Sequence, residues 1–263
     1  MQQFFAASTF FLSMTLFYIF VATLAAGLLS VLLAATIALT WLPRFADRMV
    51  AFAVGLLLTF AFTDLLPEAM HQGFDPREVG LVLLGGLLAF FMLEKVALWR
   101  HDHRHAQGLP SHTPRVAMIV VGDGLHNFVD GVLIAAAFLT DPALGWTTAL
   151  AVLAHEIPQE MSDFMVLLSA GVEKRRALLL NAVSGLAMVA GGVLGYLALQ
   201  QAEAAIPYVL SVSAASFIYI AVADLVPELH RKRQPSDWLS QGLLLTLGLG
   251  TVLLIGELLP HSH

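Results

Sequence analysis

Residues 115–139 read RVAMIVVGDGLHNFVDGVLIAAAFL, and this stretch decides the fold. Apart from a polar centre it is an unbroken apolar run, long enough for a helix that crosses the hydrocarbon core of a bilayer. The polar residues at its centre would therefore lie near the bilayer midplane. Ionisable side chains at that depth cost about 3 kcal/mol each on insertion scales, so they normally face a protein interior and mark an ion or substrate pathway.

The same pattern returns in residues 146–170, where His155-Glu156-Ile157-Pro158-Gln159-Glu160 interrupts a second apolar run. Charged or proline-containing breaks divide most of the remaining chain into segments of similar length. The sequence therefore predicts an all-α polytopic membrane protein with eight transmembrane helices. These helices are expected over about residues 15–41, 47–71, 78–98, 115–139, 146–170, 176–199, 206–229 and 237–259.

The predicted helices form one transmembrane domain over residues 1–263, with a histidine-containing cytoplasmic loop at about 99–114. Residues 1–43 carry no charge and so lack the basic region of a cleavable signal peptide, and we expect them to belong to the mature protein. Residues 1–43 are best explained by a short segment at the membrane interface followed by the first transmembrane helix.

Composition supports a membrane protein, because 58% of the residues are hydrophobic and only 12% are charged. The chain has no cysteine, which excludes disulfides, thiolate metal sites and cysteine nucleophiles. Histidine, carboxylate and amide groups remain as possible ligands. The net charge of −6 and the shortness of the basic runs give no reason to expect a nucleic-acid partner, so membrane lipid is the expected surroundings.

The basic residues predict the orientation in the membrane. When the loops between the predicted helices are assigned alternately to the two sides of the membrane, one side receives Arg77 and the other side receives all the remaining Lys and Arg residues. An excess of Lys and Arg marks the cytoplasmic side, so we expect both termini outside a plasma membrane, here a bacterial inner membrane. The residues on the cytoplasmic side would be Arg44, Arg48, Lys95, Arg100, Arg104, Arg115, Lys174, Arg175, Arg176, Arg231, Lys232 and Arg233.

A short internal repeat links the second and seventh predicted helices. Asp64-Leu65-Leu66-Pro67-Glu68 and Asp224-Leu225-Val226-Pro227-Glu228 share the pattern D-L-x-P-E, and their helices would run in opposite directions. This indicates an inverted repeat of three, two and three helices, an arrangement that many secondary transporters use for alternating access. The repeat would put one carboxylate pair near the outer mouth of a pathway and the other near the inner mouth. The alternative is two unrelated helix ends kinked by proline.

Helical spacing predicts how the polar residues at the midplane converge. Residues four apart share one helix face, which pairs His126 with Asp130, His155 with Gln159, and Glu156 with Glu160. Two facing helices with imidazole and carboxylate groups at these spacings supply the ligands that a divalent transition metal needs. The candidate metal ligands are His126, Asn127, Asp130, His155, Glu156, Gln159 and Glu160.

Interhelical hydrogen bonding is the alternative for any one of these residues, but three carboxylates and two imidazoles on two facing turns favour a metal site. Asp123 and Asp163 flank the two motifs. Each could extend the pathway, take up a proton or pair with a neighbour.

The two motifs resemble those of the ZIP (Zrt- and Irt-like protein) metal-ion transporters. The resemblance rests on the run Asp123-Gly124-Leu125-His126-Asn127-Phe128-Val129-Asp130-Gly131 and on the 155–160 motif followed by Asp163-Phe164. It is strongest for the subfamily that carries HNFxDG and HExPHE, and the run FFMLEK at residues 90–95 also resembles that group. The resemblance implies an eight-helix plan with both termini outside, uptake of zinc or a related metal into the cytosol through a two-metal site, and a homodimer.

By motif position, the resemblance implies a primary site of His126, Asp130, His155 and Gln159. A secondary site would take Asn127, Glu156 and Gln159. The chain departs from the family at Gln159, where relatives have a metal-binding His or Glu, and an amide carries no charge with which to bridge two ions. Some bacterial relatives have a glutamate on the sixth helix where this chain has Met188. We therefore expect one metal site rather than two.

The leading functional hypothesis is a transporter in which an ion enters past Asp64 and Glu68 and leaves past Asp224 and Glu228. A passive metal-selective channel would use the same ligands and differ only in its kinetics. An intramembrane zinc metalloprotease is suggested by His155-Glu156, the first half of an HExxH motif, but Gln159 occupies the position of the second histidine. We expect no enzymatic activity. Zinc is the expected substrate, although nitrogen and oxygen ligands also accept iron, manganese and cadmium.

Overall fold

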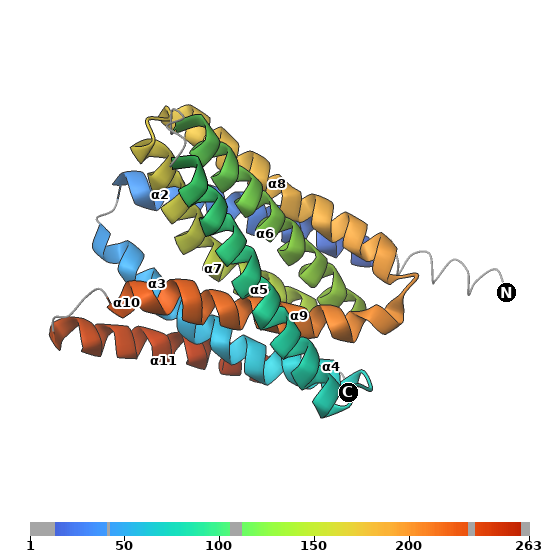
Figure 1. The fold of residues 1–263 in the computed structure, drawn as a ribbon. Helices are drawn as coiled ribbons and strands as arrows, with labels where there is room; N and C mark the ends of the chain where they lie inside the picture. Colours follow the sequence, from blue (N-terminus) through green and yellow to red (C-terminus); the bar gives the residue numbers. More distant parts are fainter. Residues whose placement is uncertain (1–13, 41–42, 106–111, 231–234, 259–263) are drawn as a thin grey trace.

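The computed structural model describes residues 14–40, 43–105, 112–230 and 235–258, which form a bundle of long helices (Figure 1). No β-strand occurs in these residues, so the predicted all-α fold class is confirmed. The elements are η1 (Ala25–Leu29), α2 (Ser30–Thr40), α3 (Pro43–Phe60), η2 (Ala61–Leu65), α4 (Leu66–His71), α5 (Pro76–His105), α6 (His112–Thr140), α7 (Pro142–Ser169), α8 (Lys174–Leu199), η3 (Glu203–Ala205), α9 (Ile206–Tyr219), η4 (Ile220–Leu225), α10 (Val226–His230) and α11 (Pro235–Leu258).

Seven helices in the described residues are long and apolar enough to cross a membrane. They cover Met14–Thr40, Met49–His71, Pro76–Leu93, Val120–Thr140, Lys174–Leu199, Glu203–Ala223 and Trp238–Glu257. Helix α7 is not among them, and its second half carries Glu156, Glu160 and Asp163. It packs against α2, α3 and α6, which bury Glu156 and Glu160 and leave Asp163 partly exposed. An eighth span and the arrangement of three, two and three helices are compatible with this structure and stay predictions.

Two helix ends differ from the sequence-based expectation. Helix α5 continues to His105 and α6 begins at His112, so helix extends into both ends of the segment 99–114, whose role as a cytoplasmic connection stays a prediction. The first Gly and Pro after the predicted helix end are Gly108 and Pro110, and nothing before them stops a helix. The connection that remains, residues 106–111, lies outside the described residues.

Helix α7 begins at Pro142 rather than at residue 146 because Asp141 caps it. The Asp141 Oδ1 atom accepts hydrogen bonds from the backbone N–H groups of Ala143 (2.7 Å) and Leu144 (3.2 Å), and proline is well suited to the first helical position. Since α6 ends at Thr140, a single residue joins the two helices. The resulting tight hairpin sets α6 and α7 antiparallel.

The two D-L-x-P-E sequences share an unusual local structure. A π-helical segment ends at Leu65 in one copy and at Leu225 in the other, directly before the turn that contains the proline. Proline lacks a backbone N–H and crowds the carbonyl group four residues earlier, and a wider turn accommodates both effects. The packing is also reciprocal, since η2 and α4 contact α9 while η4 and α10 contact α3. These features are compatible with the predicted inverted repeat.

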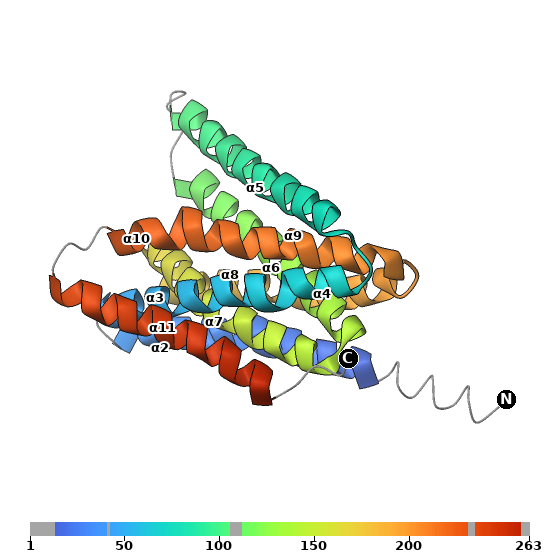
Figure 2. The ribbon, with the colours of Figure 1, turned by 90° about the horizontal axis from the view of Figure 1, so that it is seen from below.

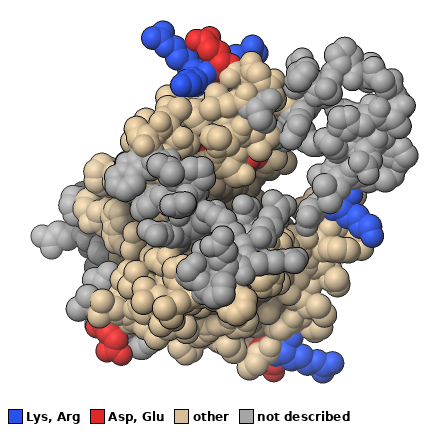
Figure 3. Space-filling model, turned by 90° about the vertical axis from the view of Figure 1, so that its left-hand side faces the viewer, with Lys and Arg blue, Asp and Glu red and all other residues tan. Residues whose placement is uncertain are grey.

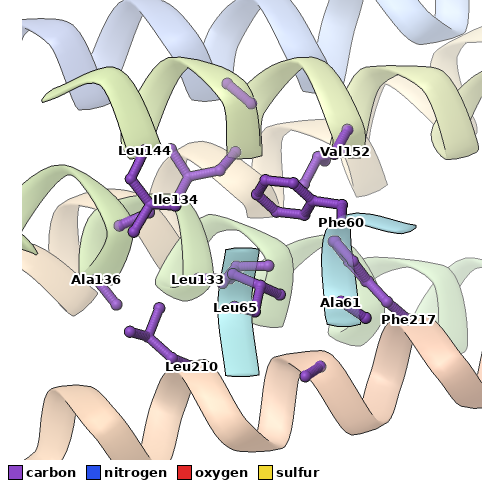
Figure 4. Close-up of a cluster of buried hydrophobic side chains, with 14 of the residues drawn as sticks. Phe60, Ala61, Leu65, Leu133, Ile134, Ala136, Leu144, Val152, Leu210 and Phe217 are labelled. Atoms are coloured by element: carbon purple, nitrogen blue, oxygen red, sulfur yellow. The ribbon is translucent and has the colours of Figure 1, made fainter. Parts of the chain in front are cut away.

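The largest apolar core lies where α3, α6, α7 and α9 meet (Figure 4). Phe60 and Phe217 face each other there with ring centroids 6.3 Å apart, and both side chains are buried. Leu133 of α6 and Val152 of α7 complete this part of the core (Figure 4). The core therefore joins α6 and α7 to the rest of the bundle close to the residues that carry the polar motifs.

Helices α5 and α11 lie at the edges of the bundle (Figure 2), and both expose large apolar side chains. An apolar outer surface is expected where lipid rather than water surrounds a protein. From the end of the bundle shown in Figure 3, Lys and Arg side chains of the described residues stand at the rim. Charges in this position fit the flanks of membrane-spanning helices.

Helices α6 and α8 form a close contact that depends on glycine. A Cβ atom added at Gly131 would lie 2.0 Å from the backbone oxygen of Met188, and one at Gly191 would lie 2.0 Å from the backbone oxygen of Phe128. Such small residues let helix backbones approach each other in membranes. The contact fixes α6, and hence its polar motif, against α8.

The substitution Gly131→Ala is expected to destabilise the protein, because the new Cβ would overlap backbone atoms of α8 that cannot rotate away. Overpacking of this kind costs about 1–3 kcal/mol. Thermal unfolding of the purified protein in detergent measures the effect. Gly122→Ala on the same helix is the matched control, because no atom lies within 4 Å of its added Cβ. Equal unfolding temperatures for the two variants would contradict the close approach of α6 and α8.

Candidate metal centre

Four of the seven predicted ligands converge between α6 and α7. Helix α6 supplies His126 and Asp130, and α7 supplies His155 and Glu156. The two histidine Nε2 atoms are 3.3 Å apart, and the Asp130 Oδ2 atom lies 3.0 Å from His155 Nε2 and 3.5 Å from His126 Nε2. The Glu156 Oε1 atom lies 3.4 Å from His126 Nε2 and 3.5 Å from His155 Nε2. We call these four residues the histidine cluster.

The histidine cluster is almost completely enclosed by protein. Asp130, His155 and Glu156 are buried, and the His126 side chain is 17% exposed. Its ligand atoms all lie within 4.8 Å of one another, a spacing from which one cation could be reached by every member. Two neutral imidazoles and two carboxylates would offset the charge of a divalent ion, and nitrogen with oxygen ligands suits zinc and its neighbours.

His155 is held in the orientation that a metal ligand needs. Its Nδ1 atom lies 3.2 Å from the backbone oxygen of Ala151, so an Nδ1–H group would donate there and leave Nε2 free to bind. The Phe217 ring of α9 packs against the imidazole at 5.2 Å between centroids. Hydrogen bonding and packing thus fix the ring with Nε2 pointing at the cluster.

Glu160 lies in a second group with Asp123 and Glu156, whose ligand atoms also lie within 4.8 Å of one another. We call these three residues the carboxylate cluster. All three are buried, and Glu156 belongs to both clusters. Asp123 comes from α6, and Glu160 lies one helical turn beyond Glu156 on α7.

The other predicted residues near the midplane lie beside the carboxylate cluster. The Asn127 Nδ2 atom donates to the backbone oxygen (3.2 Å) and the Oδ1 atom (3.0 Å) of Asp123. The Gln159 side chain lies close enough to the Asp123 carboxylate to interact with it. Asp163 follows on α7, within electrostatic reach of Asp123 and Glu156. The structure therefore puts these three residues on the flank of the histidine cluster.

Asp64 of η2 and Glu68 of α4, the carboxylates predicted at the outer mouth of the pathway, belong to neither cluster. Asp64 lines a small hollow together with Thr147 of α7 and Val252 of α11. Glu68 accepts a hydrogen bond from Gln72 Nε2 at 2.9 Å. Asp224 lies in η4 and Glu228 in α10, but their side chains are outside the described part of the structure.

Two residues of α8 complete the surroundings of the carboxylate cluster, and the sequence did not point to them. The Ser184 hydroxyl donates to the Asp123 Oδ2 atom, and the Asn181 Nδ2 atom donates to the backbone oxygen of Glu160 at 3.2 Å. Both residues are buried. The available signal was two polar residues three apart in an otherwise apolar span, which is also typical of ordinary interhelical hydrogen bonding.

Comparison with known proteins relates this arrangement to metal transport. The family model described as ZIP zinc transporter matches residues 100–256. The chain is 40% identical over 139 residues to the zinc transporter foi of Drosophila melanogaster. It is 42% identical over 122 residues to the zinc transporter ZIP4 of Homo sapiens, and 42% identical over 158 residues to the zinc transporter ZIP5 of Homo sapiens.

These alignments cover 52%, 46% and 59% of this chain, but only 20%, 19% and 28% of the respective relatives. The chain thus spans about a fifth to about a quarter of the length of the curated relatives that it matches. The region matched by the family model extends from the end of α5 to α11 and contains both clusters.

Proposed function

Because the chain belongs to the ZIP zinc transporter family, whose members are transporters and not enzymes, we propose that it carries a divalent metal ion into the cytosol and that the ion binds in the histidine cluster. Zinc is the first candidate, since the relatives above are named as zinc transporters. Membership of this family also removes the metalloprotease alternative.

One observation carries the proposal. Two imidazole nitrogens and two carboxylate oxygens lie within 4.8 Å of one another in the middle of two long helices. Burying two carboxylates without a compensating charge would be costly. The basic side chains of the described residues that lie within ion-pair distance of them are His126 and His155, which must be neutral to bind a metal. A divalent ion in this position supplies the missing charge, and it does so where a transported ion must lose its water.

The route across the membrane follows from the inverted repeat. The ion enters from outside past Asp64 and Glu68, exchanges water for the ligands of the histidine cluster, and leaves toward the cytosol past Asp224 and Glu228. The reciprocal packing of η2 with α9 and of η4 with α3 supports this symmetric plan. The protein resides in the plasma membrane, a bacterial inner membrane, with both termini outside, and it works as a homodimer.

Uptake into proteoliposomes tests the proposed function. The purified protein is reconstituted with a zinc-sensitive dye inside the vesicles, and zinc is added outside. A signal that exceeds that of protein-free vesicles and saturates with zinc is expected for a transporter. Uptake that never saturates would indicate a passive channel, and uptake equal to that of protein-free vesicles would refute metal transport.

Replacing Gln159 with histidine tests how far that position lies from the ion. An added imidazole is a stronger zinc ligand than an amide, so Gln159→His is expected to tighten zinc binding by about tenfold if the new side chain reaches the histidine cluster. Calorimetric titration of the protein in nanodiscs measures the affinity. An unchanged affinity would remove Gln159 from the ligand set and leave it as a neighbour of Asp123.

A further inference from the structure

Asp123 is the point at which side chains of three helices meet. The Asn127 Nδ2 atom of α6 donates to Asp123 Oδ1 at 3.0 Å, and the Ser184 hydroxyl of α8 donates to Asp123 Oδ2. The Gln159 side chain of α7 also lies close enough to interact with this carboxylate. Asp123, Asn127 and Ser184 are all buried. Hydrogen bonds accepted by a carboxylate are stronger than those between neutral groups, so Asp123 can hold its neighbours in fixed positions.

The acceptors of Asp123 determine which way the Asn127 amide faces. Asn127 Nδ2 donates to Asp123 Oδ1 and, at 3.2 Å, to the Asp123 backbone oxygen. Turning the amide over would set its oxygen against these two acceptors, which is unfavourable because an amide oxygen cannot donate. The Asn127 Oδ1 atom is therefore the free end of the amide, and it is buried without a hydrogen-bond partner in the described part of the structure. A buried acceptor in this state is costly unless a ligand such as a cation satisfies it.

Asn127 lies on the face of α6 that carries part of the histidine cluster. Residues 123, 127 and 130 are spaced by four and three, so they follow one face of the helix. Asp130 belongs to the histidine cluster, and Asn127 lies about one turn before it. An amide oxygen binds a divalent cation, whereas an amide NH₂ group offers only donors and does not. The direction of the Asn127 amide therefore decides whether this residue favours or opposes an ion at the cluster.

Ser184 fixes the Asp123 carboxylate from the side of α8. Its hydroxyl has one proton and three acceptors in range, namely the Asp123 carboxylate and two backbone oxygens of its own helix at 3.0 and 3.3 Å. The carboxylate is the strongest of these acceptors because it is charged. The backbone of α8 is closely packed at this point, since a Cβ atom added at Gly185 would lie 2.5 Å from the backbone oxygen of Gly27 in η1. Ser184 thus anchors Asp123 to a firmly held part of the bundle.

We propose that Asp123 and Ser184 are positioning residues, which hold the Asn127 amide so that its oxygen faces the transported ion. This inference deepens the proposed transport function and rests on it. Asp123 does not bind the ion itself and acts on it only through Asn127. The hydrogen bonds thereby select one of the three roles open to Asp123, pairing with a neighbour. Ser184, which the sequence did not single out, is the next link in the same chain of hydrogen bonds.

A double-mutant cycle separates positioning from direct binding. Zinc affinity is measured by calorimetric titration of the full chain in nanodiscs. Asp123→Ala and Asn127→Ala are each expected to weaken zinc binding at least about tenfold, the loss that is typical for an outer partner of a metal ligand. When Asn127→Ala is already present, adding Asp123→Ala is expected to change the affinity by less than about twofold, because no amide remains to be oriented.

A residue that bound zinc directly would instead lower the affinity in both backgrounds. Equal weakening by Asp123→Ala with and without Asn127→Ala would therefore overturn the proposal. Unchanged zinc affinity in Asp123→Ala would overturn it as well.

Ser184 supplies an independent set of variants, which covers the case in which Asp123→Ala fails to fold. Ser184→Ala is expected to weaken zinc binding by about fivefold, and this effect should also disappear when Asn127→Ala is present. Ser184→Thr keeps the hydroxyl donor and is expected to restore most of the affinity. Ser211→Ala is the matched control and is expected to bind zinc as the wild type does, because the hydroxyl of this buried serine donates to the Pro207 backbone oxygen of its own helix at 2.8 Å.

Two results for Ser184 would contradict its positioning role. One is wild-type affinity in Ser184→Ala, and the other is a loss of affinity that persists unchanged beside Asn127→Ala. If either accompanies normal zinc uptake by the wild type, only the positioning role fails. Absent zinc uptake by the wild type would instead refute the proposed function itself.

Discussion

Replacing either His126 or His155 with alanine is expected to lower zinc uptake into proteoliposomes to the level of protein-free vesicles. Each imidazole contributes an Nε2 atom to the histidine cluster, and these two atoms lie 3.3 Å apart. Alanine leaves two buried carboxylates and a single nitrogen ligand, too few for a four-coordinate zinc ion. Loss of a neighbour that merely orients a metal ligand typically costs 10–100-fold in affinity, so removing the ligand itself is expected to cost at least about 100-fold.

His230→Ala is the matched control for these variants. His230 is an exposed histidine at the end of α10, and its replacement is expected to leave zinc uptake unchanged. Gel filtration and circular dichroism establish that each variant is folded before uptake is compared. Retained uptake in both folded variants, His126→Ala and His155→Ala, would remove the histidine cluster from the transport path.

The second large effect is expected for Glu156→Gln, which changes the residue common to both clusters. Glutamine keeps the size of the side chain but removes the charge that lies 3.4 Å from His126 Nε2 and 3.5 Å from His155 Nε2. Zinc affinity is expected to fall at least about 100-fold, and uptake with it. Because Asp130 belongs to the histidine cluster alone, Asp130→Asn is expected to weaken zinc binding but to leave the carboxylate cluster intact.

Glu203→Gln provides the same chemical change at an exposed position and is expected to transport zinc as the wild type does. The comparison isolates the effect of charge at the shared position from any general effect of removing a carboxylate. Uptake by Glu156→Gln within about twofold of the control, a difference of roughly 0.4 kcal/mol, would show that this residue does not hold the ion.

The fold class followed from the sequence because bilayer thickness imposes one length on every spanning segment. The helix ends were harder to predict. The start of α7 depended on the Asp141 side chain accepting backbone hydrogen bonds, which changed a connection into the first turn of a helix. Helix α5 extends to His105 because no helix-breaking residue follows the end of its apolar run. Hydropathy did not predict this extension, because the added residues are polar.

The convergence of His126 with Asp130 could be predicted because both lie on one helix at a spacing of four. The placement of Glu160 could not be predicted in the same way. Its neighbour Asp123 lies on another helix, and which residues of α6 and α7 face each other depends on the single-residue connection between these helices and on their crossing. The sequence therefore predicted Glu160 as a candidate ligand but assigned it to the same group as the histidines.

The contributions of α8 escaped prediction for a related reason. Asn181 and Ser184 resemble the polar residues that join helices in any membrane bundle. Their role depends on the close approach of α6 and α8, which in turn depends on Gly131 and Gly191 fitting against backbone atoms. The position of a glycine in the sequence does not indicate which helix it will contact.

X-ray absorption at the zinc edge is the most direct test of the central claim that α6 and α7 jointly hold the ion. The full chain in nanodiscs is loaded with one equivalent of zinc, and the spectrum reports the type and distance of the ligands. The histidine cluster predicts two imidazole nitrogens at about 2.0–2.1 Å together with carboxylate oxygens, and His126→Ala should retain only one imidazole. A wild-type spectrum with oxygen ligands alone would contradict the account.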